Sequence, residues 1–344
     1  STGRKGLAGV SPRANAIPLE NIVNYAAGTL ATPNTGYFGG GSGGPDTLDR
    51  IDYSNDTATA SPKGSLLTTN RRDAAATGNQ LFGYFAGGIL PDKSSVDRIN
   101  YSNDTATALA RGPLTATRAY FAATGNADFG YFGGSDSPVR SSVDRIDYSN
   151  DTATALARGP LSLARRQLAG TGNQSFGYFG GGDSGGGTKE SRVDRIDYSN
   201  DTATASTKGP LTDARGYVAA TGNADFGYFG GGEGPGYISI IDRVNYSNDT
   251  ATTVAKGPLS SAKERMAATG NVDFGYFGGG IPGTLSTVDR VDYSNDTATA
   301  SPKGPLSAGR FSFSAFSARA NGFVPIGPSV VSNAAAVAGS FNPT

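Results

Sequence analysis

The sequence contains no cysteine, no histidine and no tryptophan, and it has only one methionine among 344 residues. Without Cys or His there is no disulfide framework and no zinc, haem or iron–sulfur ligand set. The same absence excludes Ser-His-Asp and Cys-His nucleophiles. We therefore expect no catalytic residues, no cofactor and no metal site, and we interpret the chain as non-enzymatic.

The charges balance, with 29 basic and 29 acidic side chains. A net charge of zero argues against the basic footprint of a nucleic-acid-binding protein and against a polybasic membrane patch. No stretch approaches the roughly 18 to 20 apolar residues that a membrane span requires. We expect neither nucleic acid nor a membrane span among the partners and structural features of this chain.

What the chain has instead is internal repetition. The string YSNDTAT occurs six times, and the string GYF or its near equivalent recurs six times in a second phase, both with steps of 47 to 50 residues. The GYF tyrosines are Tyr37, Tyr84, Tyr131, Tyr178, Tyr228 and Tyr276. A period near 50 with a glycine doublet is typical of a four-stranded propeller blade. Six copies predict one architecture rather than two unrelated domains.

Each copy divides into four short runs, which the last complete copies illustrate. FGYFGGG (274–280) and VDRVDYS (288–294) are rich in strand formers, TATASPKGPL (297–306) begins as a strand, and MAATGN (266–271) ends in a turn signal. No segment of 12 or more residues inside the repeats has the apolar periodicity of a helix. The fold class that follows is all-β.

Three recurring features have expected structural roles. The glycine doublets that follow the aromatic run are expected on the innermost strand, where blades crowd the axis. The SNDT string is expected to form a hairpin turn, because Asn and Asp tolerate positive φ. The Asp-Arg pair of each second run, for example Asp97-Arg98, is expected in an ion-pair network between blades, with the arginine reaching backbone carbonyls.

These runs together resemble a kelch repeat: an aromatic run, Gly-Gly, a variable loop, V-[DE]-R-[IV]-[DN]-Y, an N-D-T turn and PL-x-x-x-R. The resemblance extends from Tyr37 to about Phe316 and departs from the kelch pattern in lacking its usual Trp. It implies a six-bladed kelch-like β-propeller of four-stranded antiparallel blades. Strings such as GYFGGG and VDRIDYSNDTATASPKGPL are also similar to those of structural proteins assigned to marine bacteriophages.

The domain organisation places the propeller at residues 37–327. Residues 1–36 are expected to form an irregular N-terminal arm, and residues 328–344 a C-terminal tail. Two segments could supply a closing strand: 25–30 (YAAGTL), or 321–327 (NGFVPIG), where Phe323 follows Tyr276 by 47 residues. Either could instead add to the edge of a neighbouring subunit. We favour six blades, with one terminal segment reserved for assembly contacts.

The sequence offers three candidate chemistries besides a scaffold role: phosphate binding, glycoside hydrolysis and calcium binding. The glycine clusters lack the following helix of a phosphate loop. Acids repeated six times are scaffold, because a single glycosidase-type site breaks the symmetry. Calcium needs only oxygen ligands and stays open, although no D-x-D-x-D spacing occurs.

The copies differ mainly in two places: the loop after the glycine doublet, and the short stretch after PL-x-x-x-R. In a four-stranded antiparallel blade both emerge on the same side, so the two variable sets should share one face. Loops on a rigid scaffold are where recognition usually occurs, and exposed Tyr120, Phe121, Tyr217 and Tyr237 favour contact use. The predicted binding face contains Asp92, Lys93, Tyr120, Phe121, Arg140, Arg166, Lys189, Tyr217, Tyr237 and Arg265.

Two function hypotheses follow. The first is a structural or interaction protein of a virion (tail, fibre or capsid-associated) that contacts other virion proteins, itself as a homo-oligomer, or a host receptor. The alternative is an extracellular carbohydrate-binding adhesin that attaches to a surface glycan. Both place the chain on a virion or outside the cell.

Overall fold

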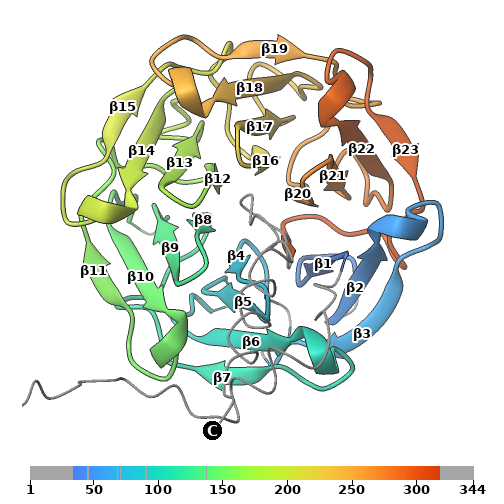
Figure 1. Ribbon diagram of the computed structural model, residues 1–344, viewed down its shortest axis with the longest axis horizontal. Coiled ribbons are helices and arrows are strands. Elements are labelled where there is room, and N and C mark those ends of the chain that lie inside the picture. The colour runs from blue at the N-terminus through green and yellow to red at the C-terminus, as the bar shows by residue number, and fades with distance from the viewer. Residues whose placement is uncertain are drawn as a thin grey trace, which may run out of the picture. The chain divides into compact units, whose positions relative to one another are not determined.

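The computed structural model describes residues 34–317, apart from residues 45, 68, 70, 90 and 137. Within them, 24 strands form six four-stranded antiparallel sheets arranged around an axis, as Figure 1 shows. This confirms the predicted all-β, six-bladed propeller with four-stranded blades. The sheets are numbered as blades 1 to 6 in the order of the GYF tyrosines. The segments 1–33 and 318–344, which include both segments considered for closure, lie outside the described residues.

Each blade has the same order of strands from the axis to the rim. The innermost strands are β24 (Ser314–Ser317), β4 (Ala75–Gly78), β8 (Ala122–Gly125), β12 (Ala169–Gly172), β16 (Ala219–Gly222) and β20 (Ala267–Gly270). The second strands are β1 (Thr35–Gly39), β5 (Phe82–Ala86), β9 (Phe129–Gly133), β13 (Phe176–Gly180), β17 (Phe226–Gly230) and β21 (Phe274–Gly278).

The third strands are β2 (Thr47–Asp52), β6 (Val96–Asn100), β10 (Val143–Asp147), β14 (Val193–Asp197), β18 (Ile241–Asn245) and β22 (Val288–Asp292). The rim strands are β3 (Ser61–Ser65), β7 (Leu109–Arg111), β11 (Leu156–Arg158), β15 (Ser206–Lys208), β19 (Val254–Lys256) and β23 (Ser301–Lys303). One 3₁₀ turn joins each third strand to its rim strand: η1 (Tyr53–Asn55), η2 (Tyr101–Asn103), η3 (Tyr148–Asn150), η4 (Tyr198–Asn200), η5 (Tyr246–Asn248) and η6 (Tyr293–Asn295). The predicted SNDT hairpin is therefore present, but the expected positive φ is wrong: the turn is a 3₁₀ turn, in which Asp56, for example, has φ of −74°.

The expectation that the glycine doublets line the axis is wrong. The innermost strand of blades 2 to 6 is the A-[AG]-T-G run, whose small side chains satisfy the crowding that was attributed to the doublets. The glycines end the second strand instead, and residues such as Gly87 and Gly88 turn the chain with φ of 64° and 107°. Small residues do converge on the axis, but they belong to the fourth run of each repeat.

The ring closes through the C-terminal strand β24. It pairs antiparallel with β1, with Phe316 opposite Tyr37 and Ala315 opposite Phe38. Blade 1 therefore takes its innermost strand from the end of the described chain and its other three strands from the beginning. Closure removes two sheet edges that would otherwise be unpaired.

Apolar cores lie between adjacent blades rather than within one. A typical cluster joins Tyr84 and Val96 of blade 2 to Phe132, Ile146 and Tyr148 of blade 3. Tyr84 stacks on Tyr148 with ring centroids 4.8 Å apart. Each blade therefore buries its aromatic second strand against the next blade, and an isolated blade would leave that surface exposed to water.

Two sets of ion pairs recur with these cores. The Asp-Arg arginine of one blade bonds the SNDT aspartate of the next, as Arg98 does with Asp151 at 2.7 Å, and Tyr84 donates its hydroxyl to the same carboxylate at 2.9 Å. Blade 6 bonds blade 1 in the same way, through Arg290 and Asp56. The predicted network between blades is confirmed, and these carboxylates are already satisfied by protein donors.

The arginine that reaches backbone carbonyls is a different one from that predicted. In blade 4 it is Arg165, the last residue of the PL-x-x-x-R motif, which donates to the carbonyls of Gly181 and Arg192 and pairs with Asp194 at 2.8 Å. The side chains of Arg165 and Asp194 are both fully buried. Blade 6 has Lys263 at the equivalent position, paired with Asp289 at 3.1 Å.

Among the described residues, the hydroxyl hydrogen bonds of the 3₁₀-turn tyrosines repeat in five of the six copies and are absent in one. In five blades the tyrosine hydroxyl meets the threonine of an adjacent innermost strand, as Tyr148 meets Thr77 at 3.3 Å. In the sixth position Phe316 stands where threonine is expected, and the buried Tyr101 hydroxyl has no hydrogen-bond partner among the described residues. Burial raises the pKa of Tyr101 far above its ordinary range.

We expect Tyr101→Phe to raise the melting temperature and Tyr148→Phe to lower it. The first substitution removes a buried, unpaired hydroxyl, whose desolvation costs about 1 kcal/mol or more, whereas the second breaks a hydrogen bond of about 1 kcal/mol. Thermal unfolding of the two variants followed by circular dichroism measures both shifts. Shifts of the same sign would show that the Tyr101 hydroxyl is satisfied in solution.

Candidate functional site

The two variable segments of each copy meet on one face of the propeller. Isolated backbone bridges join the loop after the second strand of a blade to the connection that leads into the same blade, as in Arg72–Ile89, Arg166–Asp183 and Gly216–Glu233. The prediction that both variable sets share one face is therefore confirmed. The opposite face carries the repeated T-G-N and SNDT turns.

At the axis of this face, six residues form what we call the axial ring. Each lies two positions after the buried Arg or Lys of PL-x-x-x-R, and each has a positive φ of 52° to 58° although none is glycine. The ring consists of Asp73, Tyr120, Gln167, Tyr217, Arg265 and Ser312.

Backbone hydrogen bonds close the axial ring. The amide of Tyr120 donates to the carbonyl of Asp73 at 2.8 Å, and the amide of Gln167 donates to that of Tyr120 at 2.6 Å. The series continues through Tyr217, Arg265 at 3.4 Å and Ser312, and the amide of Asp73 completes it by donating to the carbonyl of Ser312 at 2.8 Å. All six ring amides are therefore used within the ring.

The neighbours of each ring residue explain its unusual backbone. In blade 3, Arg118 is buried in its ion pair two residues before Tyr120, and Phe121 is buried against Phe132 directly after it. Tyr120 turns the chain between these buried side chains by adopting the left-handed region, at about 1–2 kcal/mol for a non-glycine residue. Such strain is typical of positions whose side chains serve a binding site.

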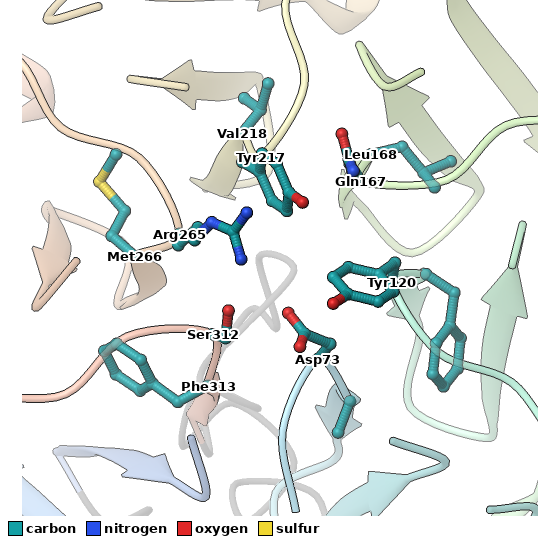
Figure 2. Close-up of a pocket in the computed structure, with 12 residues that line it drawn as sticks. Asp73, Tyr120, Gln167, Leu168, Tyr217, Val218, Arg265, Met266, Ser312 and Phe313 are labelled. Carbon is teal, nitrogen blue, oxygen red and sulfur yellow. The ribbon is translucent and has the colours of Figure 1, made fainter. Parts of the chain in front are cut away.

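The side chains of the axial ring are all different in type except for the two tyrosines. Figure 2 shows the Asp73 carboxylate, the Arg265 guanidinium and the hydroxyls of Tyr120, Tyr217 and Ser312 pointing toward the axis. They line a depression of about 80 Å³, together with buried residues such as Leu168 and Met266. The scaffold is nearly sixfold, but the chemistry of this depression is not.

Charge and burial set the properties of these side chains. Burial raises the pKa of Asp73 to about 6, against the lowering influence of Ser312, Arg265 and Tyr120. The Arg265 guanidinium lies 3.9 Å from the centre of the Tyr217 ring, and the Lys189 ammonium lies 5.4 Å from it. Burial also raises the pKa of Tyr217 to about 12. Tyr217 is thus a neutral hydroxyl held in place by two cations.

We expect Asp73→Asn to stabilise the protein at pH 7.5 by up to about 3 kcal/mol, at about 1.4 kcal/mol for each pKa unit, and to have a much smaller effect near pH 4. The folded carboxyl holds its proton up to about pH 6 whereas the unfolded one loses it near 3.8, so the wild type loses stability as pH rises between these values. Asparagine removes that cost and tolerates the left-handed region. Urea unfolding of both proteins at the two pH values measures the change in the free energy of unfolding. An equal gain at pH 4 would contradict the ionisation argument.

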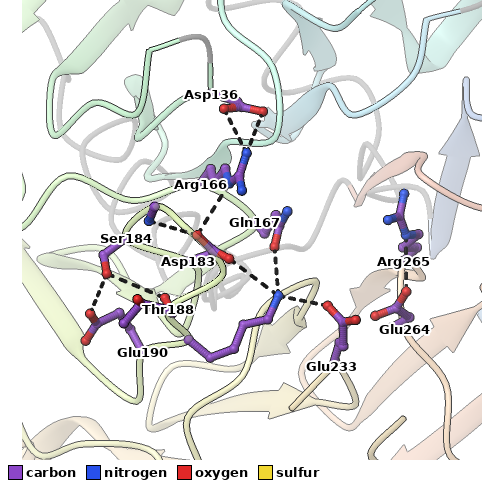
Figure 3. A network of polar contacts seen from close by, with 12 residues as sticks. Asp136, Arg166, Gln167, Asp183, Ser184, Thr188, Glu190, Glu233, Glu264 and Arg265 are labelled. Carbon is purple, nitrogen blue, oxygen red and sulfur yellow. Dashed lines mark hydrogen bonds and ion pairs between the residues drawn. The ribbon is translucent and has the colours of Figure 1, made fainter. Parts of the chain in front are cut away.

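Beside the ring, an ion-pair network crosses the loops of blades 3 to 5 (Figure 3). Arg166 bonds both carboxylate oxygens of Asp136, at 3.0 and 3.1 Å, and lies 3.5 Å from buried Asp183. Lys189 bonds Glu233 at 2.8 Å and the side-chain carbonyl of Gln167 at 3.2 Å. The network fixes the variable loops relative to the ring.

One acid next to the ring is incompletely satisfied. Glu264 is buried, and its Oε1 accepts from Arg265 at 3.2 Å. Its Oε2 has no hydrogen-bond partner in the part of the chain that the structure describes. Burial raises the pKa of Glu264, and neighbouring Glu233 raises it further.

Nine of the ten predicted face residues separate into three groups, and Phe121 lies apart from them. Tyr120, Tyr217 and Arg265 belong to the axial ring, and Arg166 and Lys189 to the ion-pair network. Asp92, Lys93, Arg140 and Tyr237 lie in loops of the same face, and Tyr237 is 46% exposed. The prediction that Phe121 is exposed is wrong, because only 5% of it is accessible and it packs in the core between blades. Tyr120 and Tyr217 were also predicted as exposed but are half-buried.

Sequence reasoning missed Asp73, Gln167 and Ser312 as site residues, although all three lie in the variable stretches. The signal that finds them is their constant offset of two residues from Arg71, Arg165 and Arg310. The described residues contain no group of three or more Asp or Glu side chains arranged to hold a metal ion. Across the same residues, no helix has the length and apolar character needed to cross a bilayer.

Comparisons with known proteins support the fold. No protein-family model matches the chain, and no curated protein does. Among solved structures 470 chains match. One is described as "Structure of YjhT", with 12% sequence identity, a TM-score of 0.59, and coverage of 72% of this chain and 87% of that chain. At this identity the likeness extends to the fold alone: the chain is a six-bladed β-propeller, a scaffold that suits protein interactions.

Proposed function

We propose that this chain is a non-enzymatic interaction protein whose variable face binds a partner. The observation that supports this is the axial ring: six strained positions, equivalent in backbone, carry a mixed set of side chains on a nearly repeated scaffold. A purely structural ring would have glycine or asparagine at these positions, because both tolerate positive φ at lower cost. Contact with a partner gives a reason to keep the costlier residues.

We further propose that the protein is kelch-like and a component of a phage virion, in contact with other virion proteins or a host receptor. This rests on the sequence resemblance, from the Gly-Gly and V-D-R-[IV]-D-Y strings to PL-x-x-x-R. Balanced charge and the closed ring of blades suit a rigid module that is displayed or built into a particle. Mass spectrometry of purified particles tests it, and absence of the chain from intact virions would contradict it.

A photo-cross-linking pair tests which face is used. One variant carries the photoreactive residue at Tyr237, 46% exposed on the variable face, and the matched control carries it at Val272, 40% exposed in a turn of the opposite face. In intact particles we expect a partner cross-link from position 237 and none from 272. The reverse result would overturn the assignment of the face, even if the chain is present in the particle.

A second function, attachment to a surface carbohydrate, is favoured by one specific observation. The axial depression combines a carboxylate, a guanidinium, an amide and three hydroxyls within a single small hollow. Planar charged groups and hydroxyls beside aromatic rings are chemically suited to sugar hydroxyls. In this form the protein would be a lectin-like adhesin.

A further inference from the structure

The size of the axial depression limits what can enter it. Its volume is about 80 Å³. Pockets for whole small molecules are about 300–1,000 Å³. The depression therefore admits polar groups from the edge of a ligand, while the rest of that ligand lies over the loops.

The lining is electrically balanced. Asp73 and Arg265 are its two charged side chains among the lining residues, and Figure 2 shows both charged groups turned toward the axis. An anion at Arg265 would meet the Asp73 carboxylate, and a cation at Asp73 would meet the guanidinium. The six ring amides are bonded to ring carbonyls, so they do not form the amide nest that binds phosphate. The balance favours an uncharged ligand.

The Ser312 hydroxyl is the least satisfied polar atom of the lining. Ser312 is only 7% exposed, its hydroxyl lies close enough to the Asp73 carboxyl to lower the pKa of Asp73, and it has no well-aligned hydrogen bond among the residues described. A ligand hydroxyl that bonds both groups would complete their hydrogen bonding. Asp73 can only accept when ionised, Arg265 can only donate, and the hydroxyls of Ser312 and Tyr120 can do both.

We propose that the axial depression binds the hydroxyl edge of one neutral sugar residue. Hydroxyls suit this lining because a hydroxyl both donates and accepts: it donates to Asp73 and accepts from Arg265. The half-buried ring of Tyr120 packs against the C–H groups of the sugar. This proposal rests on the proposed role of the face in attachment to a surface carbohydrate, and it specifies the class of sugar that binds.

Saturation-transfer NMR and calorimetry of the full chain with methyl glycosides of glucose, galactose and mannose test the proposal. We expect at least one to bind at pH 7, and Asp73→Asn and Ser312→Ala to weaken it about tenfold or more, in line with the loss of a hydrogen bond to a charged or buried group. Asp128→Asn is the matched control, because Asp128 is an exposed acid in a turn of the opposite face. It should leave the affinity unchanged.

Three results would overturn the proposal. The first is no binding of any neutral glycoside at millimolar concentration, and the second is equal binding by the wild type and both ring variants. The third is preference for a glycoside that carries a carboxylate. Melting temperatures of the variants separate lost binding from lost folding, and Gln167→Asn gives a third ring variant that tolerates the same backbone. A cross-link from position 237 without glycoside binding would leave the interaction role standing and remove only the sugar.

Discussion

Replacing Arg165 with methionine is expected to lower the free energy of unfolding by about 3–5 kcal/mol, the cost of leaving a buried charge without its partner. Arg165 and Asp194 are both fully buried, with Nη2 and Oδ2 2.8 Å apart. The guanidinium also satisfies the carbonyls of Gly181 and Arg192. Methionine fills similar volume but leaves the carboxylate and two carbonyls without those donors.

Arg145→Met in blade 3 is the matched control. Arg145 pairs with Asp201 at 2.7 Å, but its side chain is 17% exposed. Asp201 also keeps Arg158 and the hydroxyl of Tyr131 as partners. We expect a loss of about 1 kcal/mol. Urea unfolding of both variants compares the pairs, and equal losses would contradict the view that burial determines the energy.

A double variant sharpens this comparison. Arg165→Met with Asp194→Leu removes both charges, and such replacement of a buried pair by apolar residues is often neutral or stabilising. Here Ser162 donates to Asp194 from both its amide and its hydroxyl, so these donors would lose their acceptor. We expect the double variant to recover part, but not all, of the stability lost in Arg165→Met.

The number of blades was predictable from the sequence, whereas the order of strands within a blade was not. Steps of 47 to 50 residues and turn signals specify the number of blades and of strands in each. The A-[AG]-T-G run has only four residues and no large side chain, so the pattern does not indicate that it lies innermost. That position follows from the crowding at the axis, which the small residues of blades 2 to 6 satisfy.

Closure was not predictable because β24 does not look like its equivalents. It reads SAFS where blade 2 has AATG, and Phe316 replaces threonine. Its place is shown by register, since Phe316 follows Thr269 by 47 residues. Segment 321–327 was considered because Phe323 follows Tyr276 by one period, and segment 25–30 because it could imitate a fourth strand. The strand that closes the ring, β24, lies just before the first of these.

The candidate site was predictable as a face but not as a ring. Tyr120 and Phe121 are adjacent in the sequence and both aromatic, yet one lies at the axis and the other in the core. The positive φ of Tyr120 points its side chain to the axis, while the next residue, Phe121, enters the core. This turn comes two residues after the buried Arg118. Local composition carries no sign of it, whereas alignment of the six copies on the PL-x-x-x-R motif does.

Phe316→Ala is expected to lower the free energy of unfolding by about 3–5 kcal/mol, the usual cost of removing a buried phenylalanine ring. Phe316 is 2% exposed, and its ring centroid lies 5.0 Å from that of Phe85 and 5.4 Å from that of Tyr37. The loss falls on the strand that closes the propeller. We therefore expect the β1–β24 pairing to open before the other blades unfold, which hydrogen exchange of the β1 amides measures.

Two comparison variants separate closure from simple loss of packing. Phe132→Ala removes an equally buried ring from blade 3, so it should cost a similar amount without faster exchange in β1. Phe316→Thr restores the residue type of blades 2 to 6 and gives the Tyr101 hydroxyl a partner, so it should cost about 1 kcal/mol less than Phe316→Ala. If β1 exchanges equally fast in the Phe132 and Phe316 alanine variants, β24 is not the point at which the ring opens. Faster exchange confined to the Phe316 variants would identify the four residues of β24 as the closure of the propeller.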